Sequence, residues 1–210
     1  GRLPADAEAV VARLPNLDPE AARGLVRAVV ARAPAWAAAA AAALLEHHDA
    51  GLQVEALRAL EHAEGDVPAD RLLRLLHAGQ EGVRVAVAQV LGRRAVAPAF
   101  SALEAALTER RDCSNAEADA LGRALAQVHP GRALELFGRW LEIKKGLLGR
   151  LSGGLKADPL RWAAVAGLGA HPAPDAVARI EAVAKEADEA LRRHCFATLA
   201  RRRHEGARHG

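Results

Sequence analysis

The sequence predicts an all-helical fold, on three observations. Alanine, the residue with the highest helix propensity, fills 52 of the 210 positions. The aromatic residues that strands favour make up only 3% of the chain. Helical segments of similar sequence also recur at a spacing of 31 residues, which is typical of architectures built from stacked helical repeats.

The recurring segment is an amphipathic stretch with one polar position, which we call the slot. An apolar residue precedes the slot, a run of small or apolar residues follows it, and two copies close with a Leu-Gly pair. The steps between successive slots are 31, 77 and 31 residues, so the long interval has room for one further unit and an insertion. The slots hold Gln53, Arg84, Arg161 and Arg192, and a step of 31 back from the first leads to Ala22.

A second helical stretch is predicted after Ala22, Gln53, Arg84 and Arg161, whereas the copy at Arg192 has none. A proline stands 12 to 15 positions after each of these four residues, at Pro34, Pro68, Pro98 and Pro174. Proline is favoured at the first helical position because its missing N–H would have no partner there. Each repeat is therefore predicted to be a pair of helices.

The helix boundaries carry their own signals. N-caps are predicted at Asp18, Asp49, Asp158 and Asp188. Gly92 and Gly169 are predicted to mark the ends of two first helices.

The long interval is predicted to hold one more helix pair, over residues 115–128 and 131–143, followed by an insertion over residues 144–157. Residues 4–14 have the pattern of a second helix without its first.

In this pattern the sequence resembles the HEAT repeats, and among them the short bacterial type similar to phycobilisome-lyase repeats. The best matches are residues 83–107 and 160–187, whereas residues 115–143 lack both the arginine and the Leu-Gly pair. The resemblance implies an α-solenoid, a right-handed superhelix of stacked antiparallel helix pairs with about five repeats and half-repeat caps. It implies a single domain over residues 1–205 and a flexible basic tail over residues 206–210.

The slot arginines are expected to be structural in such an array. An acidic residue three or four positions earlier is the expected partner, as with Glu81 before Arg84 and Asp158 before Arg161.

Charge and hydropathy limit the classes of function. The 29 basic and 26 acidic residues give a net charge of +3, a mild excess. The most apolar run, residues 33–45, is shorter than the roughly 20 residues of a membrane span. Cys113 and Cys195 are expected to be reduced thiols, because the core needs no disulfide. These features predict a cytoplasmic protein without membrane contact.

Residues for catalysis are scarce. The chain has three serines, two threonines and two cysteines, and no serine lies in a strand-to-helix turn. Gly149 and Gly154 have the spacing of a phosphate loop, but Leu155-Lys156 follows where Lys-Ser or Lys-Thr is required. The sequence therefore predicts a protein that is not an enzyme, with no catalytic residue and no cofactor.

Nine histidines raise the alternative of a metal site, for which residues 46–49 with Glu61, His62 and His77 are the candidates. Neighbouring histidines of a helix point about 100° apart, so two ligands would have to come from separate helices. An iron hydroxylase built from similar repeats has His-Glu pairs in its first helices, whereas the His-Glu pair here, His204-Glu205, lies near the C-terminus. We assign no metal ligand and expect these histidines to cap helix ends.

The predicted function is a scaffold or adaptor that binds a protein partner or an adjoining domain. In the family that the sequence resembles, second helices line the concave face, and here their polar stripes carry both signs of charge, as a protein-binding surface does. The insertion is a further candidate contact, because loops often carry binding residues. The residues expected to contact the partner are Arg71, Arg74, Glu104, Glu135, Arg139, Glu142, Lys144, Lys145, Arg150, Glu181 and Lys185.

Two alternatives stay open. Nucleic acid would bind to arginines and to the basic end of the chain, residues 201–210, but a groove that grips DNA should be mostly basic and carry aromatic residues. A role like that of the bilin lyases among the related repeats would need a chromophore pocket lined by aromatic residues. Trp36, Trp140 and Trp162 are instead expected in the core.

Overall fold

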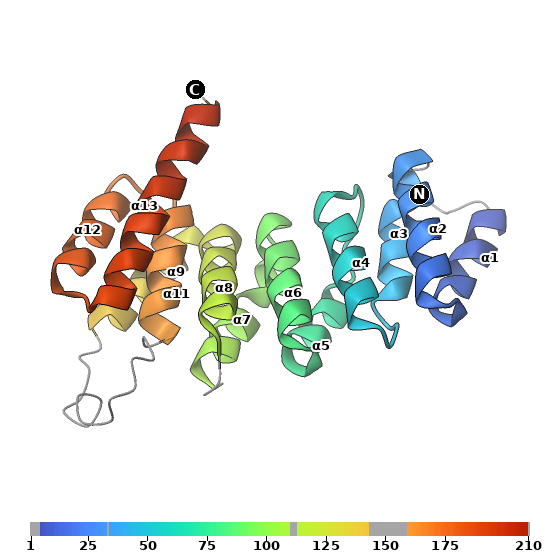
Figure 1. Ribbon diagram of the computed structural model, residues 1–210, viewed down its shortest axis with the longest axis horizontal. Coiled ribbons are helices and arrows are strands. Elements are labelled where there is room, and N and C mark those ends of the chain that lie inside the picture. Colours follow the sequence, from blue (N-terminus) through green and yellow to red (C-terminus); the bar gives the residue numbers. More distant parts are fainter. Residues whose placement is uncertain (1–4, 33, 110–112, 143–158, 210) are drawn as a thin grey trace. The chain divides into compact units, whose positions relative to one another are not determined.

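The computed structural model describes residues 5–32, 34–109, 113–142 and 159–209, and every regular element in these ranges is a helix (Figure 1). The prediction of an all-helical fold is confirmed. No helix in these ranges combines the length and the apolar character that crossing a membrane requires. The chain divides into two compact units, residues 1–94 and residues 95–210.

The first unit is built around α4, which packs against α2, α3 and α6. Helix α3 also contacts α1 and α2, and α5 contacts α6. The elements are α1 (Ala5–Arg13), the 3-10 turn η1 (Leu14–Asn16), α2 (Pro19–Arg32), α3 (Pro34–Leu44), α4 (Ala50–His62), α5 (Ala69–Ala78) and α6 (Glu81–Arg93). The fully buried side chains include Leu44, Leu52, Leu57, Leu60, Leu72, Leu76 and Leu91.

The second unit is built around α11, which packs against α8, α9, α12 and α13. Its buried side chains include Leu103, Leu121, Leu125, Phe137, Val165, Leu168 and Ile180. The last helix extends through His209, although the sequence predicted a tail from residue 206. The elements are the 3-10 turn η2 (Ala97–Ala99), α7 (Phe100–Thr108), α8 (Asn115–Val128), α9 (Pro130–Glu142), α11 (Pro159–Ala170), α12 (Ala176–Glu186) and α13 (Glu189–His209).

The helix starts follow the predicted signals. Asp49 accepts a hydrogen bond from the Leu52 N–H at 2.7 Å, and Asp188 accepts one from the Leu191 N–H at 3.0 Å. Asp18 accepts from two N–H groups of the first turn of α2. The predicted cap Asp158 lies outside the described residues.

The slot residues close the helix that precedes their own. The Nε2 atom of Gln53 donates to the carbonyl oxygens of Leu45 and His47, at 3.0 and 2.8 Å, just after α3. Arg192 donates to the carbonyl oxygens of Ala184 and Ala187, at 3.1 and 2.9 Å, at the end of α12. The last carbonyls of a helix have no partner within it, so these bonds satisfy them. Glutamine replaces arginine in the slot because its amide also offers two N–H donors.

The other two slots hold Arg84 and Arg161. Arg84 donates to the carbonyl oxygen of Gly79, just after α5, at 2.6 Å. The Nε atom of Arg161 is buried and has no hydrogen-bond partner among the described residues, which do not include its expected partner Asp158. Gln53, Arg84 and Arg192 thus each donate to at least one backbone carbonyl oxygen at the end of the preceding helix.

We expect the substitution Arg192→Gln to keep most of the stability, because Gln53 makes the same kind of contact in α4. Arg192→Leu should lower the free energy of unfolding by about 1.5 kcal/mol, since the two carbonyls at the end of α12 lose their donors. Urea unfolding of the two variants tests this. No loss in Arg192→Leu would show that the donors contribute nothing at this position, and equal losses in both variants would show that glutamine does not replace arginine there.

A second set of caps lies ten residues after the slots. Arg94, at the end of α6, donates to the carbonyl oxygens of Leu60, Ala63 and Gly65 at the end of α4. Arg202, on α13, donates to the carbonyl oxygens that follow the end of α11, among them Leu168 at 3.0 Å. Arg94 therefore joins α6 to the end of α4, and Arg202 joins α13 to the end of α11.

Glycines allow α8 and α11 to approach closely. A Cβ atom on Gly122 would lie 2.0 Å from the carbonyl oxygen of Ala163, and one on Gly167 would lie 2.7 Å from the carbonyl oxygen of Gly122. Such distances exclude any side chain at these positions unless the helices move apart.

The interpretation of Gly92 and Gly169 as helix-ending glycines needs a correction. Their helices do end one residue later, but the described glycine with a positive φ is Gly65, so neither adopts the left-handed conformation of a capping glycine. A Cβ on Gly169 would lie 2.2 Å from Cγ2 of Thr198. This glycine is required by the contact between α11 and α13.

Candidate protein-binding surfaces

Arg71 and Arg74, two of the predicted contact residues, are paired within the first unit. The guanidinium of Arg71 lies 3.6 Å from Glu46 and donates to the carbonyl oxygen of Ala42 at 3.1 Å. Arg74 lies 3.4 Å from the same carboxylate. These arginines of α5 connect it to the end of α3, so any partner would compete with Glu46 for them.

Five other predicted residues form an exposed set on α9 and α12, the two second helices that pack on α11. None of the five makes a hydrogen bond or an ion pair within the described ranges, and both signs of charge occur on each helix. Arg179 of α12 lies above Gly138 of α9, since its NH1 atom would be 4.0 Å from a Cβ there. We call this set the α9/α12 surface; its residues are Glu135, Arg139, Glu142, Glu181 and Lys185.

The remaining predicted contacts are placed differently. Glu104 is half-buried on α7. Lys144, Lys145 and Arg150 lie outside the described residues, as does the whole of the predicted insertion, residues 144–157.

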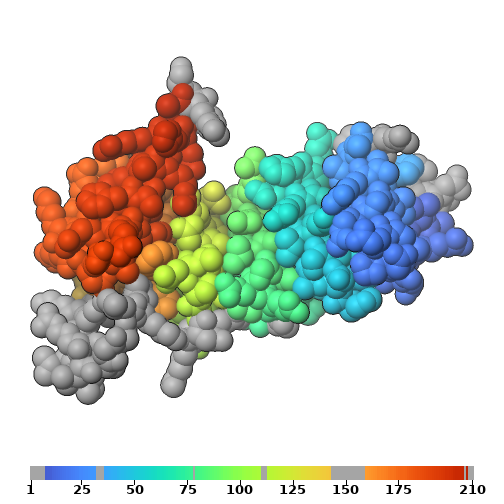
Figure 2. Space-filling view, viewed as in Figure 1, coloured from blue at the N-terminus to red at the C-terminus, as the bar shows by residue number. Residues whose placement is uncertain are grey.

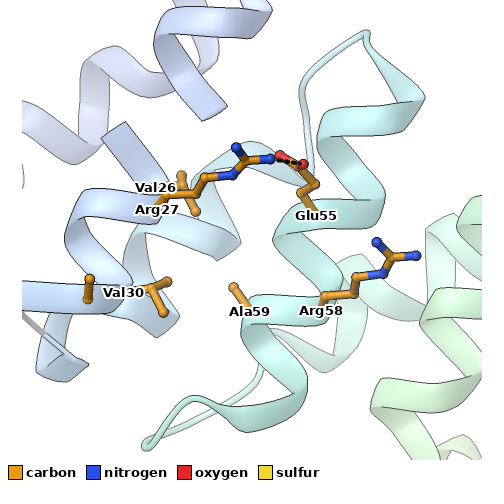
Figure 3. A pocket seen from close by; sticks show the side chains of 7 residues that line it. Val26, Arg27, Val30, Glu55, Arg58 and Ala59 are labelled. Carbon is orange, nitrogen blue, oxygen red and sulfur yellow. Dashed lines mark hydrogen bonds and ion pairs between the residues drawn. The ribbon is translucent and has the colours of Figure 1, made fainter. Parts of the chain in front are cut away.

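A groove of about 380 Å³ runs between α2 and α4 in the first unit. Figure 3 shows Val30 of α2 and Ala59 of α4 on its two sides, with the guanidinium of Arg58 directed away from it. Val30 is 42% exposed, because the apolar stripe of α2 is wider than the surface that α3 and α4 cover. The apolar residues Val26 and Val30, which line this groove, were its signal in the sequence, but the repeat pattern does not single them out.

One rim of the groove is an ion pair between α2 and α4. Arg27 lies 2.9 Å from Glu55 (Figure 3), and Arg23 lies 2.9 Å from the other oxygen of the same carboxylate. The side chain of Glu55 is only 29% exposed, and each of its two carboxylate oxygens is paired with one of the arginines.

Two buried histidines share one capping geometry. In His47 and His171, Nδ1 accepts a hydrogen bond from the backbone N–H two residues later, at 3.0 Å in both cases. Nε2 then carries the proton and donates to a carbonyl oxygen earlier in the chain, that of Leu17 for His47 and that of Pro130 for His171. Both ring nitrogens are occupied, and no group of three or more potential metal ligands occurs in the described parts of the chain.

A third buried histidine joins α13 to α8 and α11. The ring of His194 stacks on Trp162 with centroids 3.9 Å apart, and its Nε2 lies 3.2 Å from the Trp162 carbonyl oxygen. Asp119 lies 4.0 Å from the same Nε2 and also pairs with Arg123 and Arg201. Burial lowers the pKa of His194, because it disfavours the charged form more than Asp119 favours it.

The expected core positions of the tryptophans hold in part. Trp140 is buried, whereas Trp36 and Trp162 are half-buried. The described residues give no cluster of tryptophans, since Trp162 stacks on a histidine and Trp140 contacts Phe137.

We expect the stability contribution of His194 to decrease as the pH falls below 6.5, the pKa of histidine in the unfolded chain. The folded chain takes up this proton only at lower pH, so the unfolded state binds more protons in between. The resulting slope is up to about 1.4 kcal/mol per pH unit.

Urea unfolding of the native chain and of His194→Gln, at several pH values between about 5 and 7.5, measures this contribution. The glutamine amide can still donate to the Trp162 carbonyl but does not titrate, so the native chain should lose more stability than the variant as the pH falls. Parallel curves would contradict the assignment.

The thiol of Cys195 is fully buried on α13, and burial raises its pKa to about 11. The thiolate is the nucleophilic form of cysteine, and at neutral pH this group is protonated. Its environment therefore disfavours covalent catalysis.

Comparison with known proteins assigns no family. No protein-family model matches the sequence, and no curated protein or solved structure is significantly similar to it.

Proposed function

We propose that the chain is a HEAT-like α-solenoid that binds a protein partner through its second helices and acts as a non-enzymatic scaffold. The repeat assignment is supported by contacts that recur in both units at equivalent positions of the sequence repeat, namely at the slot and ten residues after it. Gln53 and Arg192 cap the preceding second helix, and Arg94 and Arg202 cap the preceding first helix. In a solenoid each repeat contacts its neighbours in this way.

The α9/α12 surface is the observation that carries the proposed function. Its charges are exposed and unpaired within the described ranges, so they can pair with a partner without first breaking a contact of the fold. Arg71 and Arg74, in contrast, are already paired with Glu46. Charges of both signs arranged on neighbouring helices give selectivity between protein partners.

Capture of the tagged chain with nuclease-treated lysate of its source organism tests this function. A bound protein should be lost with the double substitution Glu135→Lys and Arg139→Glu, which keeps the net charge. Glu64→Lys and Asp66→Lys, at exposed positions of the first unit, should leave it bound.

Two results would contradict the proposal. One is loss of all captured material on nuclease treatment, which would favour nucleic-acid binding. The other is retention of the captured protein by the α9/α12 variant.

A further inference from the structure

Helix α13 carries an unusual share of the positive charge. It contains six arginines and two glutamates, an excess larger than the net charge of +3 of the whole chain. Arg192 and Arg202 are used as caps, and Arg201 lies 3.6 Å from Asp119. Arg203 is exposed and makes no hydrogen bond or ion pair among the described residues.

One face of α13 is exposed along its length, and we call it the outer stripe. Its residues follow one another at alternating steps of four and three, so they form a single seam on the helix. Phe196, at its centre, is 59% exposed, the highest value among the large apolar side chains described. The outer stripe consists of Glu189, Arg193, Phe196, Ala200, Arg203 and Ala207.

The repeat register shows what this face does in the preceding repeat. Trp162 and Gly169 of α11 contact α13, through the rings of Trp162 and His194 and through Thr198 beneath Gly169. The positions 31 residues later are Arg193 and Ala200 of the outer stripe. The outer stripe therefore corresponds to the surface on which α11 receives a helix.

The side chains of the outer stripe determine which kind of partner helix can bind there. Small residues such as Ala200 and Ala207 let another helix approach closely, and Phe196 offers an apolar anchor. Arg193 and Arg203 stand on either side of that anchor. Among the described residues, Arg193 pairs with the exposed Glu189 alone. A second copy of the same helix would bring arginines together, which disfavours self-association through this face.

We propose that the outer stripe of α13 binds an amphipathic helix of a partner protein, with apolar residues against Phe196 and Ala200 and carboxylates against Arg193 and Arg203. This inference rests on the proposed protein-binding function and adds the chemical class of one partner segment. Figure 2 shows α13 (red) at the surface of the second unit, and in Figure 1 this helix extends past the ends of α11 and α12.

Selection from a displayed library of helical peptides on the immobilised full chain tests the proposal. We expect enriched peptides to carry apolar residues at alternating steps of three and four, flanked by Asp or Glu. Phe196→Ala and Arg203→Glu should each weaken the affinity of the best peptide at least tenfold. Val30→Ala, at an exposed apolar side chain of the first unit, is the matched control and should leave the affinity unchanged.

Four outcomes would overturn the proposal. They are the absence of any enriched helical peptide, equal binding to the Phe196→Ala variant, enrichment of basic peptides, and light scattering that shows a dimer abolished by Phe196→Ala. The proposal would also be overturned if a single-stranded oligonucleotide bound strongly, competed with the peptide and no longer bound to Arg203→Glu. That result would assign the outer stripe to nucleic acid.

The Glu135→Lys/Arg139→Glu variant separates this inference from the proposed function. It should bind the peptide as the native chain does, because the α9/α12 surface is not part of the outer stripe. Loss of the lysate partner in that variant, with no peptide selected by α13, would refute the inference and leave the proposed function standing.

Discussion

Gly122→Ala is expected to lower the free energy of unfolding of the second unit by about 3 kcal/mol. The added Cβ would lie 2.0 Å from the carbonyl oxygen of Ala163 and 2.9 Å from its Cα. These are backbone atoms of a helix that packs on three other helices, so no side-chain rotation relieves the overlap. The helices α8 and α11 would have to separate, which loosens the core around Phe137.

Thermal and urea unfolding measure this loss, and Gly24→Ala provides the matched control. Gly24 also lies within a helix, but a Cβ there meets nothing within 4 Å. Alanine at position 24 should therefore stabilise the chain by about 0.5 to 1 kcal/mol, because glycine lowers helix stability. A similar stability change in both variants would mean that the close approach of α8 and α11 does not limit the side chain at position 122.

Arg202→Met is expected to lower the free energy of unfolding by about 2 to 3 kcal/mol. Methionine keeps most of the apolar stem but removes the guanidinium, which donates to the carbonyl oxygens of Leu168, Gly169, His171 and Ala173. These carbonyls close the end of α11, and they would lose charge-assisted bonds.

The neighbouring Arg203→Met is the control, because Arg203 is exposed and has no bond within the described ranges. Its effect should stay within about 0.5 kcal/mol. Hydrogen exchange should also become faster in the last turn of α11 in Arg202→Met and not in Arg203→Met. Equal effects of the two substitutions on unfolding and exchange would show that the capping bonds do not stabilise the fold.

The order and bounds of the helices could be predicted from sequence because local signals determine them. The predicted helix over residues 115–128 is α8 itself, with Ser114 as its cap. Pro34 begins α3, whereas Pro68, Pro98 and Pro174 stand one or two residues before their helices. Caps and prolines act within one turn, so a single sequence contains the information they need.

The contacts between helices could not be predicted in the same way. The acceptors of Arg94 and Arg202 are backbone carbonyls, which every residue has, so nothing in the sequence marks them as partners. The offset of ten residues from the slots was the available signal. Gly122 was equally hidden, since a sequence does not distinguish a glycine required by packing from one required by a turn.

The candidate binding residues divide according to what surrounds them. A helix pattern identifies Arg71 and Glu135 alike as polar and outward-facing. Only the packing of α5 beside the end of α3 shows that Arg71 is paired with Glu46, whereas Glu135 is left open to solvent. The outer stripe was missed because a helical pattern does not show whether another helix covers the apolar side chain of Phe196.

The backbone acceptors have a consequence for how such a chain can change over time. A cap that donates to a carbonyl places no demand on the side chains of the helix it closes, so substitutions there leave the bond in place. The side chains of α4, α11 and α12 can then change in sequence while the bonds that close these helices persist. In α4, glutamine in place of arginine at position 53 illustrates this tolerance on the donor side as well.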